Sequence, residues 1–264
     1  HRPGIRGASG PCDRIGGGRM KSAPPWPAAG TLLLVNREHP LLRAPESEEL
    51  TAVDRRHPDI LLHRRAKVML DELLQAAGAK GSVIPVSGYR SQREQRQIWD
   101  DTVRERGLRF TRTYVAAPGC SEHQTGLAVD LGENVPDLDF ICPCFPDSGP
   151  CRALREKAAD YGFVLRYPKG KEAITGIGWE PWHFRYVGWP HARIMTERNL
   201  VLEEYLAWLR TFPAEGAPLR YRAAGRSFEV CYAPDGHLDT LEALLSSGMP
   251  CQCSDTNTGG MVFT

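Results

Sequence analysis

The chain has 264 residues, of which 41% are hydrophobic and 25% are charged, the composition of an ordinary globular protein. Its formal net charge of +1 argues against electrostatic binding to nucleic acid or to an anionic membrane surface. No apolar run approaches the roughly 20 residues that a membrane-spanning helix needs. We therefore expect neither a nucleic-acid partner nor a transmembrane segment, and the sequence leaves the oligomeric state open.

Eight cysteines are many for a cytosolic enzyme, but their spacing is not that of a disulfide framework. The runs Cys142-Pro143-Cys144 and Cys251-Gln252-Cys253 have one residue between the thiols, whereas structural zinc knuckles have two to four. We expect reduced thiols and a cytoplasmic location. A cell-surface location is the alternative if an N-terminal anchor is missing from this sequence.

The character of the sequence changes twice along the chain. Residues 1–30 are rich in Gly, Arg and Pro and predict a flexible lead-in or tag, whereas residues 31–210 carry the periodic apolar patterns of one catalytic domain. Residues 211–264 predict a small β-rich C-terminal extension. Its expected elements are a hairpin formed by 219–222 and 228–232, a short helix at 239–245 and a last strand at 261–263.

Helical and strand patterns alternate irregularly within residues 31–210. Ser91 is suited to cap a helix, with Glu94 as its capping-box partner, and Pro85 indicates a strand near a sheet edge. Without a regular βαβ repeat, the pattern predicts an α+β fold with a central antiparallel sheet flanked by helices. We expect strands at 31–36, 83–87, 127–131, 163–167 and 179–187, helices at 60–79, 91–106, 152–161 and 191–209, and loops at 45–58 and 134–150.

The stretch from Ser121 to Leu131 carries the first candidate chemistry. Asp130 lies between Val129 and Leu131, where its carboxylate would lose hydration and need a metal or a buried cation as partner. His123 lies seven positions before it. A histidine and an aspartate supply two ligands of a zinc site, and a catalytic zinc site needs a third.

The third ligand is predicted to be His183, which lies in a strand-like segment. Three protein ligands leave one zinc position open, as in a catalytic site. Glu180, three residues earlier, is the candidate general base. Its pKa should rise by desolvation and fall through the charge of the metal, and the sequence does not give the net sign. Arg90, in the turn before Ser91, is the candidate cation for the oxyanion of a tetrahedral intermediate.

Three ordered motifs support this reading. They are Ser87-Gly88-Tyr89-Arg90-Ser91 followed by Gln95, then Ser121-x-His123-x6-Asp130, and finally Trp179-Glu180-Pro181-Trp182-His183-Phe184-Arg185-Tyr186. Together they resemble the zinc D-alanyl-D-alanine carboxypeptidases, and within them the VanY/VanXY group that is linked to vancomycin resistance. The resemblance extends from about residue 33 to residue 209.

The resemblance implies one Zn²⁺ per chain, held by His123, Asp130 and His183, with Glu180 as the catalytic base. It implies that Arg90 polarises the scissile carbonyl and that Ser121 and Gln95 hold the carboxylate of the terminal D-Ala. We add Trp182 as a candidate wall of the substrate site. The implied fold is the α+β fold that these enzymes share with Hedgehog-type domains.

The predicted function is removal of the terminal D-Ala from peptidoglycan precursors that end in D-Ala-D-Ala, with cleavage of the free dipeptide as a second activity. Two alternatives remain open. The first is a cell-wall endopeptidase of the same superfamily that cuts an L-Ala-D-Glu bond. The second is a non-catalytic zinc-binding module, for which neither Glu180 nor Arg90 would be needed.

Overall fold

The computed structural model describes residues 30–234, 243, 246, 248 and 250–264. At its centre is a four-stranded sheet in the order β3-β4-β6-β5, in which every neighbouring pair is antiparallel. This arrangement confirms the expected α+β fold, with Pro85 on an edge strand. The strands are β3 (Val83–Ser87), β4 (Ala128–Glu133), β5 (Phe163–Tyr167) and β6 (Glu180–Tyr186).

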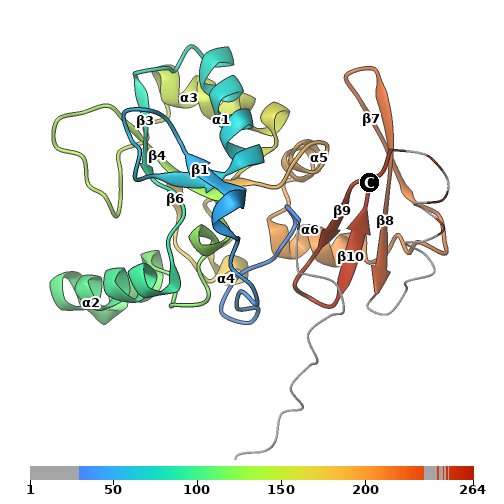
Figure 1. Cartoon of the computed structure of the whole chain (residues 1–264), viewed down its shortest axis with the longest axis horizontal. Helices are drawn as coiled ribbons and strands as arrows, with labels where there is room; N and C mark the ends of the chain where they lie inside the picture. The colour runs from blue at the N-terminus through green and yellow to red at the C-terminus, as the bar shows by residue number, and fades with distance from the viewer. Residues whose placement is uncertain (1–29, 235–242, 244–245, 247, 249) are drawn as a thin grey trace, which may run out of the picture.

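Two helices cover one face of this sheet, α1 (Arg64–Ala76) and α3 (Gly149–Lys157), which continues into the 3-10 turn Ala158–Tyr161. They lie together on one side of the sheet in Figure 1. Buried residues of the two helices and alternate residues of the strands form one core. Leu70 and Leu154 come from the helices, and Val129, Leu131 and Phe184 come from the strands. Because side chains alternate across a strand, the intervening residues of β4 and β6 face away from this core.

Several element boundaries differ from those expected. The loop predicted at 45–58 contains a 3-10 turn (Ser47–Glu49) and strand β1 (Leu50–Ala52), and the helix predicted from residue 60 begins only after strand β2 (Leu61–His63). The two strands pair with each other, which removes Leu61 and Leu62 from the helix. Helix α4 (Glu172–Thr175) was not predicted.

Helix α2 (Gln92–Tyr114) begins at Ser91, and the predicted capping box with Glu94 is present. Its predicted end at Gly107 is a kink rather than an end. Gly107 has a φ of 82° and a ψ of 160°, and the helix resumes beyond it. Glycine tolerates this backbone conformation, so the chain bends there without a long interruption.

The single helix predicted at 191–209 is wrong, because the chain forms α5 (His191–Glu197) and α6 (Leu202–Leu209). Asn199 lies between them with a φ of 51°, a left-handed conformation that ends a helix. The strand predicted at 31–36 is also wrong. Residues 32–35 are buried but belong to no strand, and the backbone bonds to partners outside the central sheet, for example Leu32 N to Ser254 Oγ at 2.9 Å.

The C-terminal extension forms a second four-stranded sheet in the order β7-β8-β10-β9. The predicted hairpin and last strand are present, and the helix predicted at 239–245 falls almost entirely outside the described residues. A second core joins this sheet to α5, α6 and the segment around Leu32 and Leu34. The strands are β7 (Leu219–Ala223), β8 (Arg226–Pro234), β9 (Cys253–Asp255) and β10 (Gly260–Phe263).

In the part of the chain that the structure describes, each helix is too short or too polar to cross a bilayer. The seven cysteines described there are all free thiols, as the spacing predicted. The predicted lead-in, residues 1–30, lies outside the described residues apart from Gly30.

Candidate active site

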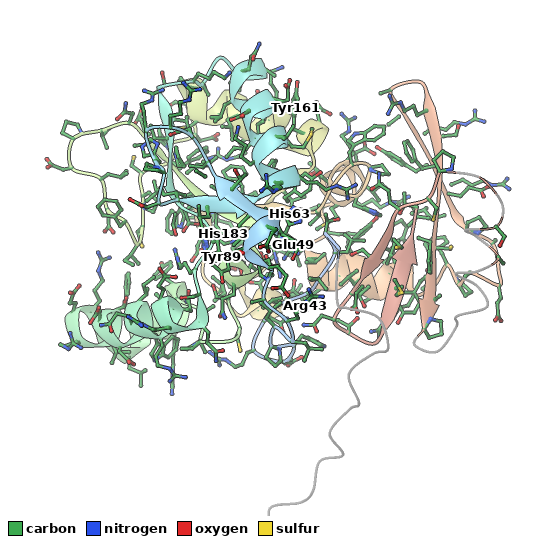
Figure 2. All side chains as sticks on the ribbon, viewed as in Figure 1. Arg43, Glu49, His63, Tyr89, Tyr161 and His183 are labelled. Carbon is green, nitrogen blue, oxygen red and sulfur yellow. The ribbon has the colours of Figure 1, made fainter. Side chains whose placement is uncertain are left out.

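Asp130 and His183 are direct cross-strand partners on β4 and β6. They occupy the face of the sheet opposite to the core, because Val129 and Phe184, which form the next pair, point into the core. Asp130 Oδ1 lies 2.9 Å from His183 Nδ1. Figure 2 shows His183 among the elements around the central sheet, away from the C-terminal sheet.

His123 reaches the same point from the 3-10 turn Glu122–Thr125. Its Nδ1 lies 2.7 Å from the carbonyl oxygen of Gly88, and its Nε2 lies 3.1 Å from Asp130 Oδ2. The carbonyl can only accept, so Nδ1 carries the proton and Nε2 presents its lone pair. Gly126 ends the turn with a φ of 70° and leads the chain into β4.

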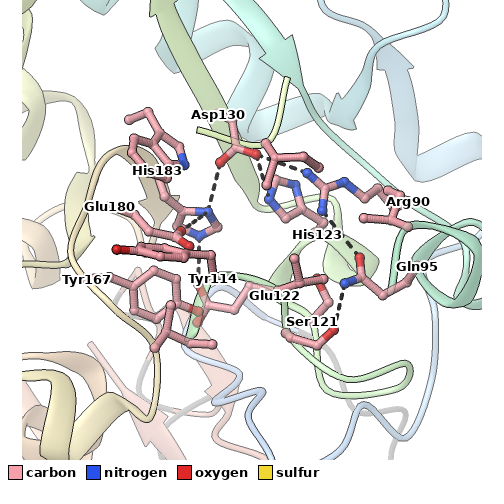
Figure 3. A pocket seen from close by; sticks show the side chains of 16 residues that line it. Arg90, Gln95, Tyr114, Ser121, Glu122, His123, Asp130, Tyr167, Glu180 and His183 are labelled. Atoms are coloured by element: carbon pink, nitrogen blue, oxygen red, sulfur yellow. Dashed lines mark hydrogen bonds and ion pairs between the residues drawn. The ribbon is translucent and has the colours of Figure 1, made fainter. Parts of the chain in front are cut away.

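These three residues form a donor set that fits zinc. One ligand atom from each of His123, Asp130 and His183 can be chosen so that all three lie within 4.8 Å of one another, and all three residues are buried. Two imidazoles and one carboxylate are the ligand types of a catalytic zinc site, which keeps a further position open. Figure 3 shows the carboxylate of Asp130 between the two imidazoles.

The protonation of the two imidazoles differs. Burial, together with the positive charge of Arg90, lowers the pKa of His123 and favours the neutral ligand form. Burial also lowers the pKa of His183, but the hydrogen bond to Asp130 and the nearby carboxylate of Glu122 outweigh it and raise this pKa to about 9. A cation that binds His183 must therefore displace a proton, which makes metal affinity depend on pH.

Glu180 is brought to the site by an irregularity in β6. Residues three apart in a regular strand point to opposite faces of a sheet. The register between β5 and β6 shifts between Leu165 and Tyr167, and Tyr167 pairs with Glu180. Glu180 Oε2 then lies 3.7 Å from His183 Nδ1. Burial raises the pKa of Glu180 to about 8. The net pKa shift, whose sign the sequence left open, is therefore upward in the protein without metal.

Arg90 is fixed on the other side of Asp130. Its Nη2 donates to Asp130 Oδ2 at 3.0 Å, its Nε donates to Ser87 Oγ at 2.9 Å, and its Nη1 lies 3.4 Å from Gln95 Oε1. Three acceptors on three elements hold the guanidinium in one orientation. The group can therefore present a preorganised positive charge to a bound substrate.

The remaining predicted residues line the same hollow, which has a volume of about 450 Å³ including space open to solvent. Ser121 and Gln95 are buried there, and Gln95 Nε2 donates to the carbonyl of Ala116 at 2.8 Å. Trp182 lines the hollow but also belongs to the core beneath the sheet. The structure thus gathers all eight predicted residues at one place, while their roles remain predictions.

No pattern in the sequence pointed to Glu122, which lies beside His123 in the chain and close to His183 in the fold. Its Oε1 accepts from Arg166 Nε and from Arg185 Nη1, both at 2.8 Å. Burial alone would raise the pKa of this carboxyl, but the two guanidinium groups hold it well below its usual range. The arginines are on other strands, 44 and 63 positions away, so the local sequence could not indicate this contact.

The chain is similar to proteins that are already known. A family profile described as VanY, D-alanyl-D-alanine carboxypeptidase, matches residues 59–189, which include the three candidate ligands, Glu180 and Arg90. The bifunctional D-Ala-D-Ala dipeptidase and carboxypeptidase VanXYC of Enterococcus gallinarum is 43% identical over 180 residues, 68% of this chain and 95% of that protein. The chain belongs to the VanY family.

Two solved structures of VanY-family enzymes extend the comparison. The vancomycin resistance D,D-dipeptidase VanXYg, in complex with a D-Ala-D-Ala phosphinate analogue, is 41% identical with a TM-score of 0.81, and the match covers 89% of this chain and 92% of that one. A mutant of the D,D-pentapeptidase VanY from a VanB-type resistance cassette, in complex with Zn(II), is 34% identical with a TM-score of 0.53. That match covers 67% of this chain and 98% of the other. The VanXYC match leaves about a third of this chain without a counterpart, whereas the VanXYg match covers most of it.

Proposed function

We propose that this protein is a zinc-dependent D,D-carboxypeptidase that removes the terminal D-Ala from peptidoglycan precursors ending in D-Ala-D-Ala, and that it also cleaves the free dipeptide. One observation supports this most strongly. The buried donor set of His123, Asp130 and His183 lies in a hollow that also contains a carboxylate and a guanidinium, Glu180 and Arg90. A dual activity is supported by the similarity to the bifunctional VanXYC.

In this proposal His123 Nε2, a carboxylate oxygen of Asp130 and His183 Nδ1 hold the zinc ion. The ion supplies Lewis-acid activation of a water molecule and of the scissile carbonyl. Glu180 accepts a proton from the attacking water and returns it to the amine of the departing D-Ala. Its pKa of about 8 without metal would fall beside a divalent cation, which favours the ionised form that a base requires.

Arg90 donates to the oxygen of the carbonyl as negative charge develops there, and its three fixed acceptors keep it oriented before substrate binds. We assign Ser121 and Gln95 to binding of the carboxylate of the terminal D-Ala. Both are buried in the hollow, and a hydroxyl and an amide can donate to a carboxylate. Trp182 forms an apolar part of the wall.

The decisive experiment measures D-Ala release from D-Ala-D-Ala and from a stem pentapeptide, with and without a chelator. We expect release from both substrates, its loss on chelation and its recovery with Zn²⁺. Glu180→Gln should abolish turnover while zinc stays bound, and retained turnover would remove Glu180 from the role of base. A cut near the L-Ala end would indicate the endopeptidase, and bound zinc without any cleavage would indicate a binding module.

We further propose a role in glycopeptide resistance, since removing terminal D-Ala depletes the precursors that the antibiotic binds. The proposed location is the cytoplasm, in agreement with seven free thiols that a reducing compartment would preserve. Fractionation of cells that express the full-length protein tests the location. Recovery of the activity on the cell surface would contradict it.

A further inference from the structure

Two buried polar atoms face each other behind the metal site without satisfying hydrogen-bond geometry. They are Glu122 Oε2 and His183 Nε2, which lie 3.5 Å apart. The Glu122 side chain is fully buried and that of His183 is 5% exposed, so solvent does not satisfy either atom. Leaving a buried polar group unsatisfied destabilises the fold, and each of these two atoms is positioned to become the partner of the other.

The contacts of the other ring nitrogen of His183, Nδ1, indicate which nitrogen carries the proton. Nδ1 faces Asp130 Oδ1 at 2.9 Å and Glu180 Oε2 at 3.7 Å, which is the side on which the donor set converges. When a cation occupies that side, Nδ1 must present its lone pair and the ring proton must reside on Nε2. Nε2–H then points at Glu122.

We propose that Glu122 is a positioning residue for the metal ligand His183: its carboxylate accepts a hydrogen bond from Nε2–H and so fixes both the tautomer and the orientation of the ring. The inference rests on the proposed function, since it concerns the same metal site. Carboxylates that accept from the second nitrogen of a ligating histidine orient the ring and make the ligand more basic.

The surroundings of Glu122 are built to keep it charged and immobile. Its other oxygen, Oε1, is held by Arg166 and Arg185 at 2.8 Å each, which leaves Oε2 for His183. Glu203 on α6 takes the remaining donors of Arg166, Nη1 at 2.9 Å and Nη2 at 2.7 Å. Two carboxylates and two guanidinium groups therefore form a buried network without net charge, in which each carboxylate has a cation as its partner.

Arg185 also attaches this network to the start of the described chain. Its Nη2 donates to the carbonyls of Thr31 and Leu33 at 3.0 and 2.8 Å, and its Nε donates to the carbonyl of Tyr186 at 3.1 Å. Arg185, which holds Glu122 Oε1, is thus itself fixed by three backbone carbonyls. A carboxylate so constrained can determine the position of the ring that it contacts.

The network also offers a matched control. Glu122→Gln and Glu203→Gln each remove one negative charge from the same buried network and preserve side-chain volume, but only Glu122 touches His183. In the full chain we expect Glu122→Gln to weaken zinc binding by about 10- to 100-fold. We also expect it to change the visible absorption spectrum of the cobalt-substituted protein. Glu203→Gln should leave the spectrum unchanged and the zinc affinity within about twofold.

Equal effects of the two substitutions on zinc affinity and on the spectrum, or no effect of either, would overturn the proposal, since a merely structural network would respond to both alike. If Glu122→Gln does not fold, nitrogen NMR of the imidazoles in the zinc-loaded wild-type protein decides. A proton on His183 Nε2 supports the proposal, and a proton on Nδ1 overturns it. None of these measurements depends on turnover, so a failure of the proposed peptidase activity would be recognised separately.

Discussion

Glu180 provides a test of the site that needs neither metal nor substrate. In the fold its pKa is about 8, against an ordinary value of 4.5 for a glutamate, because burial disfavours the charged carboxylate. Folding therefore favours the protonated form. This contribution is fully present below pH 4.5 and is lost as the pH rises through about 8. At 1.36 kcal/mol per pKa unit, the loss is on the order of 5 kcal/mol.

Glu180→Gln removes this titration while preserving the shape of the side chain. We expect the chelator-treated variant to exceed the wild-type protein in free energy of unfolding by several kcal/mol at pH 8.5 and by less than about 1 kcal/mol at pH 5. Urea unfolding at several pH values measures the difference. Glu156→Gln, at a side chain that is 62% exposed, is the control and should show a difference of less than about 0.5 kcal/mol throughout.

The reasoning would be refuted if the Glu180→Gln variant were no more stable than wild type at pH 8.5, or if its advantage did not shrink as the pH falls. Zinc gives a second check on the same group. A divalent cation beside the carboxylate favours its ionised form. The stability advantage of the variant at pH 8.5 should therefore decrease when both proteins are loaded with zinc.

Three further predictions concern the same region. Arg90→Lys keeps the charge but cannot satisfy three fixed acceptors, so kcat/KM for D-Ala release should fall by about 10²–10³ while bound zinc, measured by mass spectrometry, is retained. Asp130→Asn should lose zinc on dialysis against a buffer in which the wild-type protein keeps one ion per chain. Full retention of zinc by the variant would exclude Asp130 as a ligand. Gly126→Ala should destabilise the fold by about 2–3 kcal/mol, because its φ is 70° and an added Cβ would lie 2.7 Å from Leu50 Cδ2. Gly78→Ala, with a φ of 61° and open space around it, should cost less in the same urea titration.

The sequence predicted the elements whose signals are local. The alternation around Asp130, the capping box at Ser91 and the apolar stripe of α1 each lie within a few residues, and each was found. The strand predicted at 31–36 failed for a non-local reason. The segment at 31–36 has the composition of a strand but takes its hydrogen bonds from Ser254 and Thr256, more than two hundred positions away.

For the candidate site, the sequence by itself determined which residues are available. It supplied two histidines, an aspartate, a glutamate and an arginine in an order that identifies the family, because this chemistry requires those functional groups. It also placed Asp130 between Val129 and Leu131, where its carboxylate would lose hydration and need a metal or a buried cation as partner.

Only the tertiary structure decided how these groups meet. The pairing of β4 with β6 places Asp130 opposite His183. In a regular strand Glu180 and His183 would point to opposite faces, but a shift of register between β5 and β6 turns Glu180 toward His183. Glu122 became visible only when Arg166 and Arg185 were seen around it. A buried carboxylate is retained only where distant charges balance it, and such a balance is a property of the folded chain rather than of any stretch of sequence.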